Sequence, residues 1–199
     1  MTAEAELPNL EELHERVADR FGRRVALVTA IFAVLLAIAA LGGNHAMKEM
    51  LLAQQKSSDQ WAFYQAKVIR EHQYRGQKLR LEVDLVERGA SIKPDAREKL
   101  EGLMKTFEEE EKRYNVEKKD IEKEAKKLEH ERDVWQAKDP YFLFAEALLQ
   151  IAIVMSSVSI LAGSRAVFSF SLVLAVAGGL LTVNGFFSLF HLPLMPGGH

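Results

Sequence analysis

The stretch YFLFAEALLQIAIVMSSVSILAG, residues 141–163, contains one charged side chain, that of Glu146. All its other residues are apolar, small or uncharged. A helix needs roughly 20 such residues to cross the hydrocarbon core of a bilayer. The stretch therefore predicts a membrane-spanning helix.

The charged residues of the chain outline where further spans lie. Of 28 acidic and 26 basic residues, all except Glu146 and Arg165 lie outside two apolar blocks, at 25–43 and 141–190. The first block is long enough for one span and the second for two. We therefore predict an all-α membrane protein with three transmembrane helices, at 25–43, 140–162 and 167–190.

The segment before the first span, 1–24, has the pattern of an amphipathic helix. Asn9 can cap this helix, and acidic and basic residues occupy one of its faces. The other face carries Leu10, Leu13, Val17 and Phe21. The helix either lies in the membrane interface or packs on neighbouring helices. At the other end of the chain, the Pro- and Gly-rich segment 191–199 is expected to be a flexible tail.

Between the first two spans, residues 44–139 predict a helical hairpin outside the membrane. Two long charged segments are interrupted once, by RGASIKPD at 88–95. Gly89 can end the first helix and Pro94 suits the first turn of the second, so the turn is expected near 89–94. Each arm has about 45 residues and extends about 68 Å at about 1.5 Å per residue. Arms of equal length return the chain to the membrane.

Local signals set the limits of the last two spans. Asp139 is a good N-cap and Pro140 fits the first position of a helix, so the second span is expected to begin there. The sequence GSRA at 163–166 predicts a tight turn between the spans. Small residues at four-residue steps predict close packing of the third span: Ser171, Ala175 and Gly179.

The second arm carries a large apolar residue at every seventh position, which is typical of a coiled-coil seam. These residues are Leu100, Phe107, Tyr114, Ile121, Leu128 and Trp135. The companion positions are mixed, with apolar Met104 and Ala125 but charged Glu111, Lys118 and Arg132.

A fold about Ser91 and Ile92 would pair residues whose numbers sum to about 183. This pairing predicts that Phe107 lies opposite Gly76, a glycine facing a large ring. It also predicts Tyr114 opposite Ile69 and Leu128 near Gln55.

The first arm is apolar around more of its circumference than one neighbouring helix can cover. Its side chains include Trp61, Phe63, Tyr64, Val68, Ile69, Tyr74, Leu79, Leu81, Val83 and Leu85. Identical copies are the simplest cover, because symmetric self-association is common, although half-exposed aromatic side chains need no partner. We expect hairpin or oligomer contacts from Trp61, Tyr64, Val68, Leu79, Phe107, Tyr114, Ile121, Leu128 and Trp135.

The arginines before the first span favour an N-terminus on the inside of the membrane. They are Arg16, Arg20, Arg23 and Arg24. Basic residues before the second span oppose this, but loops longer than about 60 residues cross largely regardless of charge. We therefore expect the hairpin on the outside, which in a bacterium is the periplasm.

Three polar residues within the apolar blocks form a candidate intramembrane set: Glu146, Gln150 and Asn184. Glu146 and Gln150 are four residues apart and share one helix face. A carboxylate facing lipid near the bilayer centre costs about 2.5 kcal/mol or more, so Glu146 is expected to face protein or water, or to be protonated. It either anchors helices or subunits, lines an ion or proton path, or contacts a lipid head group. Asn184 is expected at the opposite leaflet, where it could not pair with Glu146 in one chain.

Several classes of site have no sequence signal. The six histidines are scattered without a paired metal motif, the chain has no cysteine, and no phosphate-binding glycine loop or nucleophile motif is found. The segment 44–140 balances 21 basic against 21 acidic residues, which argues against a nucleic-acid partner. We expect no catalytic residues, no cofactor and no metal.

Three blocks resemble a bacterial membrane family known as domain of unknown function 4337. They are RRVALVTAIFAVLLAIAALGGNHAMKEMLLAQQKSSDQWAFYQAKVIREHQYR at 23–75, KKLEHERD at 126–133 and DPYFLFAEALLQIAIV at 139–154. The resemblance covers nearly the whole chain. It implies a bacterial membrane protein with this layout of spans and hairpin, and it implies no activity, cofactor or catalytic residue.

The leading functional hypothesis is a non-enzymatic, homo-oligomeric protein of the bacterial inner membrane. Its coiled-coil stalk would act as a structural scaffold or interaction module whose partners are membrane lipids, its own copies and proteins that the sequence does not identify. The alternative is a small-ion channel or transporter subunit in which Glu146 and Gln150 line an oligomeric path.

Overall fold

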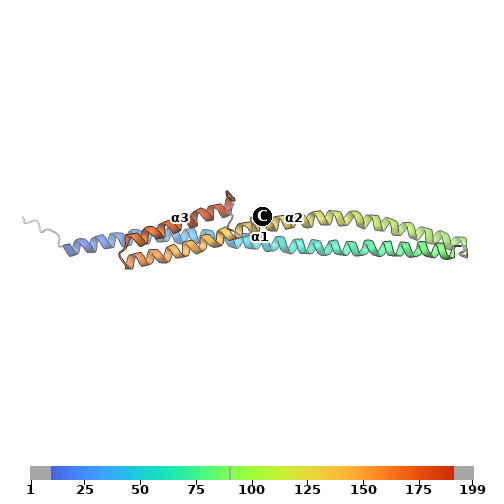
Figure 1. Ribbon diagram of the computed structural model, residues 1–199, viewed down its shortest axis with the longest axis horizontal. Coiled ribbons are helices and arrows are strands. Elements are labelled where there is room, and N and C mark those ends of the chain that lie inside the picture. The colour runs from blue at the N-terminus through green and yellow to red at the C-terminus, as the bar shows by residue number, and fades with distance from the viewer. Residues whose placement is uncertain (1–9, 90, 191–199) are drawn as a thin grey trace, which may run out of the picture. The chain divides into compact units, whose positions relative to one another are not determined.

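The computed structural model describes residues 10–89 and 91–190, with side chains from Arg20 onward. Three helices account for nearly all of them: α1 (Leu10–Arg88), α2 (Pro94–Leu161) and α3 (Arg165–Phe187) (Figure 1). No strand occurs within these ranges. The predicted cap at Asn9 and the tail at 191–199 lie outside the described residues.

Each helix contains a segment that is long and apolar enough to cross a membrane. The mean hydropathy of the best 18-residue window is 2.7 in α1, 1.9 in α2 and 2.2 in α3. The structure therefore confirms the coarse prediction of an all-helical chain with three long apolar helices.

The helix that was expected to begin at Pro140 does not begin there. α2 runs without interruption from Pro94 to Leu161, with Pro140 in its interior. Proline cannot donate a backbone hydrogen bond and usually breaks or kinks a helix. Here packing continues on both sides, since Leu128 is buried before Pro140 and Phe142 and Leu149 are buried after it. The prediction of a helix start was wrong because the sequence signal is local and this packing is not.

The connection between α1 and α2 falls between Arg88 and Pro94. In it, the amide and the hydroxyl of Ser91 both donate to the carbonyl of Arg88 at 2.8 Å. Between α2 and α3, Gly163 adopts a positive φ of 60°, a conformation that glycine reaches without steric strain. Ser164 caps α3, so α3 begins at Arg165, two residues before the predicted start.

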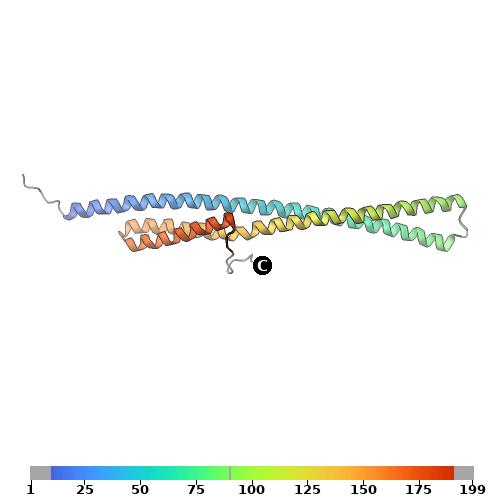
Figure 2. The same ribbon diagram turned by 90° about the horizontal axis from the view of Figure 1, so that it is seen from above.

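The structure divides into two units, which we describe separately. The first comprises the described residues of Met1–Glu49 and Val134–His199. Here α3 lies beside α1 and α2, as both views show (Figures 1 and 2). All three helices contribute to its buried core, which consists of Phe32, Ala39, Ala145, Leu149, Ala152 and Ala175.

Close helix packing in this first unit depends on small residues. The buried positions of α3 include Ser171, Ala175, Gly178, Thr182 and Gly185. A Cβ on Gly178 would lie 2.9 Å from Cγ of Leu149, whereas one on Gly179 would meet nothing within 4 Å. The close approach therefore occurs at Gly178 and not at the predicted Gly179, because the buried positions follow steps of four and three residues and not four alone.

The second unit, Met50–Asp133, consists of the charged parts of α1 and α2. The numbers of contacting residues sum to values between 181, for Tyr74 with Phe107, and 190, for Trp61 with Glu129. A nearly constant sum means that the two segments run antiparallel.

The individual pairs predicted in the second unit are wrong. Ile69 is 66% exposed, Gln55 is exposed, and a Cβ on Gly76 would meet nothing within 4 Å. Ile69 and Gly76 each lie five residues after a residue that faces α2, namely Tyr64 and Glu71, and Gln55 lies two residues before buried Ser57. All three are therefore on the outer side of α1. A helix turns by about 100° per residue, so an error of two or three residues in the pairing moves a side chain to the opposite face.

Candidate functional site

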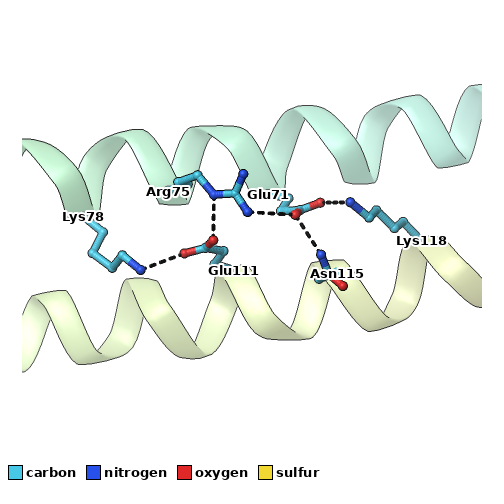
Figure 3. Close-up of polar contacts among 6 residues, drawn as sticks. All are labelled: Glu71, Arg75, Lys78, Glu111, Asn115 and Lys118. Carbon is cyan, nitrogen blue, oxygen red and sulfur yellow. Dashed lines mark hydrogen bonds and ion pairs between the residues drawn. The ribbon is translucent and has the colours of Figure 1, made fainter.

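The most enclosed group of charges lies between α1 and α2 in the second unit (Figure 3). Glu71 on α1 is only 1% exposed. Its carboxylate accepts hydrogen bonds from Lys118 and, at 2.9 Å, from Asn115 on α2, while Arg75 of its own helix lies at 3.5 Å. The buried charge is therefore surrounded by donors from both helices.

A second carboxylate, that of Glu111 on α2, links to the same group. It accepts a hydrogen bond from Arg75 at 2.7 Å and one from Lys78 at 3.0 Å, both on α1 (Figure 3). Arg75 thus contacts Glu71 and Glu111 together. We call Glu71, Arg75, Lys78, Glu111, Asn115 and Lys118 the charged network.

The environment of each carboxylate shifts its pKa. Desolvation of Glu71 favours its neutral form, but hydrogen bonds from Lys118 and Asn115 and the nearby positive charges outweigh this and lower its pKa. Hydrogen bonds from Arg75 and Lys78 lower the pKa of Glu111. Both carboxylates are therefore held in the charged form that the network needs.

The expected contact residues of α2 lie along its side facing α1 in this unit. Tyr114 is buried, stacks on Tyr74 with ring centroids 5.7 Å apart, and receives a hydrogen bond from Arg113 at 3.1 Å. Phe107 contacts the same Tyr74 ring at 5.9 Å. Leu128 is buried and Ile121 is half-buried.

The expected contact residues of α1 divide between two sides of the helix. Trp61 donates to the carboxylate of Glu129 on α2 at 2.9 Å and packs edge-on against Tyr64. Val68 is half-buried. Leu79, in contrast, is half exposed and lies away from α2, as do Phe63 and Ile69.

Trp135 belongs to the first unit. Its ring meets that of His45 on α1 edge-on at 5.4 Å, and the ammonium group of Lys138 lies 4.6 Å from its centroid. Aromatic rings with a lysine nearby are typical of the place where an apolar helix segment meets water.

Glu146 and Gln150 lie on the side of α2 that is only partly covered. Glu146 is half-buried and Gln150 is exposed. The Oε1 atom of Glu146 lies 3.2 Å from the point that a Cβ on Gly43 would occupy, so the carboxylate reaches α1 where glycine leaves room. Within the described residues, neither side chain makes a hydrogen bond or an ion pair to another side chain.

Asn184 does not lie where the sequence analysis placed it. Phe142 contacts Phe186 and lies within 3 Å of a Cβ built on Gly185, so the end of α3 lies beside the part of α2 that contains Glu146. The sequence prediction was wrong because neighbouring antiparallel helices bring the end of one to the start of the other. Glu146 and Asn184 therefore lie at the same end of the α2 and α3 pair.

The polar groups of Asn184 are satisfied by the chain that follows α3. Its amide nitrogen donates to the carbonyl of Phe190 and its amide oxygen accepts from the backbone nitrogen of Phe190, both at 2.9 Å. Asn184 thus closes the turn after α3 and does not join the other two polar residues.

Sequence reasoning missed two polar contacts between helices. The hydroxyls of Ser156 on α2 and Ser171 on α3 are fully buried and lie 3.0 Å apart. In the charged network, Glu111 and Lys118 are two of the charged companion positions of the seam and are seven residues apart. Their spacing was the signal, because it places both charges toward α1, where Lys78 and Glu71 oppose them.

Among the side chains that the structure describes, no group of three or more His, Asp or Glu residues could hold a metal ion. In the charged network, both carboxylates already accept hydrogen bonds from side chains of the network itself. Its arrangement suits a fixed contact between two helices.

The chain was compared with protein families, with curated proteins and with solved structures. Residues 21–188 match the family profile called domain of unknown function, DUF4337. No curated protein and no solved structure matched the chain. The match covers well over half of the 199 residues, so this chain belongs to the family of domain of unknown function 4337.

Proposed function

We propose that this protein is an integral membrane protein of the bacterial inner membrane that associates with copies of itself. Its three apolar helix segments cross the bilayer, and its charged segment forms a coiled-coil hairpin outside. It acts as a structural scaffold or interaction module and performs no catalysis.

The observation that carries this proposal is the exposure of the apolar segments. Only between 22% and 28% of the residues in their most apolar windows are buried within the chain. Exposed side chains occur on all three helices, among them Leu27, Ile31 and Leu41 on α1, Val154 and Leu161 on α2, and Val173 and Leu180 on α3. Such large exposed apolar surfaces mark contact with a membrane or another protein.

Self-association is supported by the outer side of the second unit. Phe63, Ile69 and Val83 on α1 remain at least half exposed although α2 covers the other side of the helix. In water, burying such side chains contributes roughly 1.5 to 3 kcal/mol each. A second copy offers the same surface and is the simplest cover.

Two measurements test the proposal. The protein, expressed in bacteria, is expected to remain with the membrane fraction after alkaline carbonate washing. Its mass in mild detergent, corrected for bound detergent, is expected to be a multiple of the 22.4 kDa chain. Release by carbonate would contradict membrane insertion, and a monomeric mass would contradict self-association.

A second candidate function is a subunit of an ion path, favoured by the positions of Glu146 and Gln150. An exposed amide and a partly exposed carboxylate within an apolar segment are costly in lipid, and an oligomer could bring them to a central water-filled path. Ion flux into liposomes containing the protein is expected to fall with Glu146→Ala if this is correct. Flux that is absent, or indifferent to the substitution, would eliminate this candidate.

A further inference from the structure

The outer side of α1 in the second unit carries a regular strip without any charged residue. It includes Ile69, Gly76 and Val83, each five residues after an inward position and therefore turned by about 140° from it. The full set, which we call the outer strip, is Leu51, Gln55, Ser58, Ala62, Gln65, Ile69, His72, Gly76, Leu79, Val83 and Val86. All eleven residues are exposed.

The spacing of the outer strip is that of a second coiled-coil seam. Successive members are separated alternately by four and three residues over the whole length. This alternation keeps a seam facing one partner helix. From Leu51 to Val86 the strip extends about 53 Å at about 1.5 Å per residue.

The equivalent strip on α2 provides a comparison within the same unit. It has eleven exposed residues at the same alternating spacing, also on the side away from the partner helix: Glu98, Gly102, Lys105, Glu109, Lys112, Val116, Lys119, Lys123, Lys126, His130 and Asp133. Eight of these are charged, whereas none is charged on α1. Exposure to water would favour charged residues equally on both helices, so it does not explain why the strip on α1 has none.

We propose that the outer strip is the surface along which α1 of a second copy packs, parallel and in register; this rests on the proposed function, in which all copies cross one bilayer in the same direction. Near the twofold symmetry axis that relates two such copies, each side chain meets the same side chain of the other copy. A charged residue would then face its own charge. A partner of different sequence would tolerate complementary charges, so complete absence of charge favours a second copy.

The chemistry of the strip suits contact with itself. Gln55, Ser58 and Gln65 carry both hydrogen-bond donors and acceptors, so each can bond to its own counterpart. Small residues allow the helices to approach. Two surface grooves adjoin the strip, one lined by Ala62, Phe63 and Ala66 with Asp59 and the other by Leu79 and Val83 with Arg80 and Asp84. Apolar side chains of the other copy can enter these grooves as knobs enter holes.

A matched pair of substitutions tests the strip in the full-length protein in detergent. Ile69 and Val116 are 66% and 62% exposed, one on each outer side. Ile69→Lys is expected to lower the oligomeric fraction at least about tenfold, because lysines of the copies would face each other, while Val116→Lys leaves it unchanged. Circular dichroism should show equal helix content in both variants. An oligomer that persists in Ile69→Lys, or is lost equally in Val116→Lys, overturns the inference.

Cysteine cross-linking provides a test without an added charge. The chain has no cysteine, so single substitutions give unambiguous bonds. A disulfide needs Cα atoms within about 7 Å, so Ala62→Cys is expected to form dimers under mild oxidation and Val116→Cys is not. Dimers only at Val116→Cys, in a protein that is oligomeric by mass, would overturn the strip and leave self-association standing. A monomeric wild type would overturn both.

Discussion

Glu71 shows how one buried charge can determine the pairing of two long helices. An unpaired carboxylate at this depth would be costly, but Lys118 and Asn115 compensate for the lost water. A slip of seven residues along α1 in one direction would place Lys78 opposite Lys118, and a slip in the other direction would place Glu71 opposite Glu111. Apolar seams repeat every seven residues and tolerate such slips, whereas the charged network does not. The network therefore fixes the register.

We predict that Glu71→Ala destabilises the second unit by about 3 kcal/mol, since it leaves Lys118 facing α1 without a partner. Glu122→Ala serves as a control, because Glu122 is partly exposed and pairs with Lys126 within α2, not with α1. Such surface pairs contribute about 0.5 kcal/mol or less. Amide hydrogen exchange around residues 64–78 and 111–121 should accelerate about a hundredfold in the first variant. Equal rates in the two variants would contradict the role of Glu71.

The lowered pKa values of Glu71 and Glu111 predict loss of stability in acid. Their stabilisation is fully present above the pKa of the unfolded chain, near 4.5, and is lost as pH falls through the lower folded-state pKa values. The unfolding midpoint should hold from pH 7 to about 4.5 and fall below it. In the double variant Glu71→Gln and Glu111→Gln, the unfolding midpoint should decrease less below pH 4.5 than in the wild type. A midpoint that rises on acidification would refute the assignment.

Among the elements, α3 packs closely on α2 through its glycine positions. Gly178 and Gly179 are neighbours, yet a Cβ on the first would lie 2.9 Å from Cγ of Leu149 and 3.1 Å from the backbone oxygen of Ala145. The second has open space. A backbone oxygen within a helix cannot move aside easily, so the helix pair would have to separate.

We predict that Gly178→Ala destabilises the packing of α3 by about 1 to 3 kcal/mol, the usual cost of overpacking. Gly179→Ala is the matched control and should be neutral or stabilising by up to about 1 kcal/mol, because alanine favours the helix. Thermal unfolding of both variants in the same detergent measures the difference. The reverse order of midpoints would show that α2 and α3 are not in contact at Gly178.

The length of α2 also shows an element overriding a local signal. Pro140 removes one backbone hydrogen bond, which ordinarily costs about 3 kcal/mol or more within a helix. Buried side chains before and after it, such as Leu128 and Phe142, support the helix on either side. Asp139 and Pro140 are residues that usually mark the start of a helix, but here both lie within one.

At the scale of the whole molecule, the proposed arrangement predicts which segments face which side of the membrane. A cysteine at Ser91, in the exposed link between α1 and α2, should react with a membrane-impermeant maleimide in intact spheroplasts. A cysteine at Arg165, the first residue of α3, should react only after lysis. The opposite pattern would reverse the orientation, and the cysteine-free wild type provides the background.

The sequence by itself determined the three long apolar helices and the charged segment between them. Length and hydropathy are sums over neighbouring residues, so they need no knowledge of contacts. The link near Gly89 and the seven-residue spacing on α2 are equally local. These features place Tyr114 and Leu128 on one side of their helix before any partner is known.

Only the tertiary structure decided which side of α1 faces α2 and which residues meet there. Apolar side chains surround α1 in the second unit, so its sequence offers several seams, and a pairing error of two or three residues exchanges the inner for the outer side. The contacts of Glu71 and Glu111 select one seam, and that choice leaves the outer strip exposed. The position of Asn184 beside the start of the apolar part of α2 likewise follows from antiparallel packing, which is a property of two helices and not of either alone.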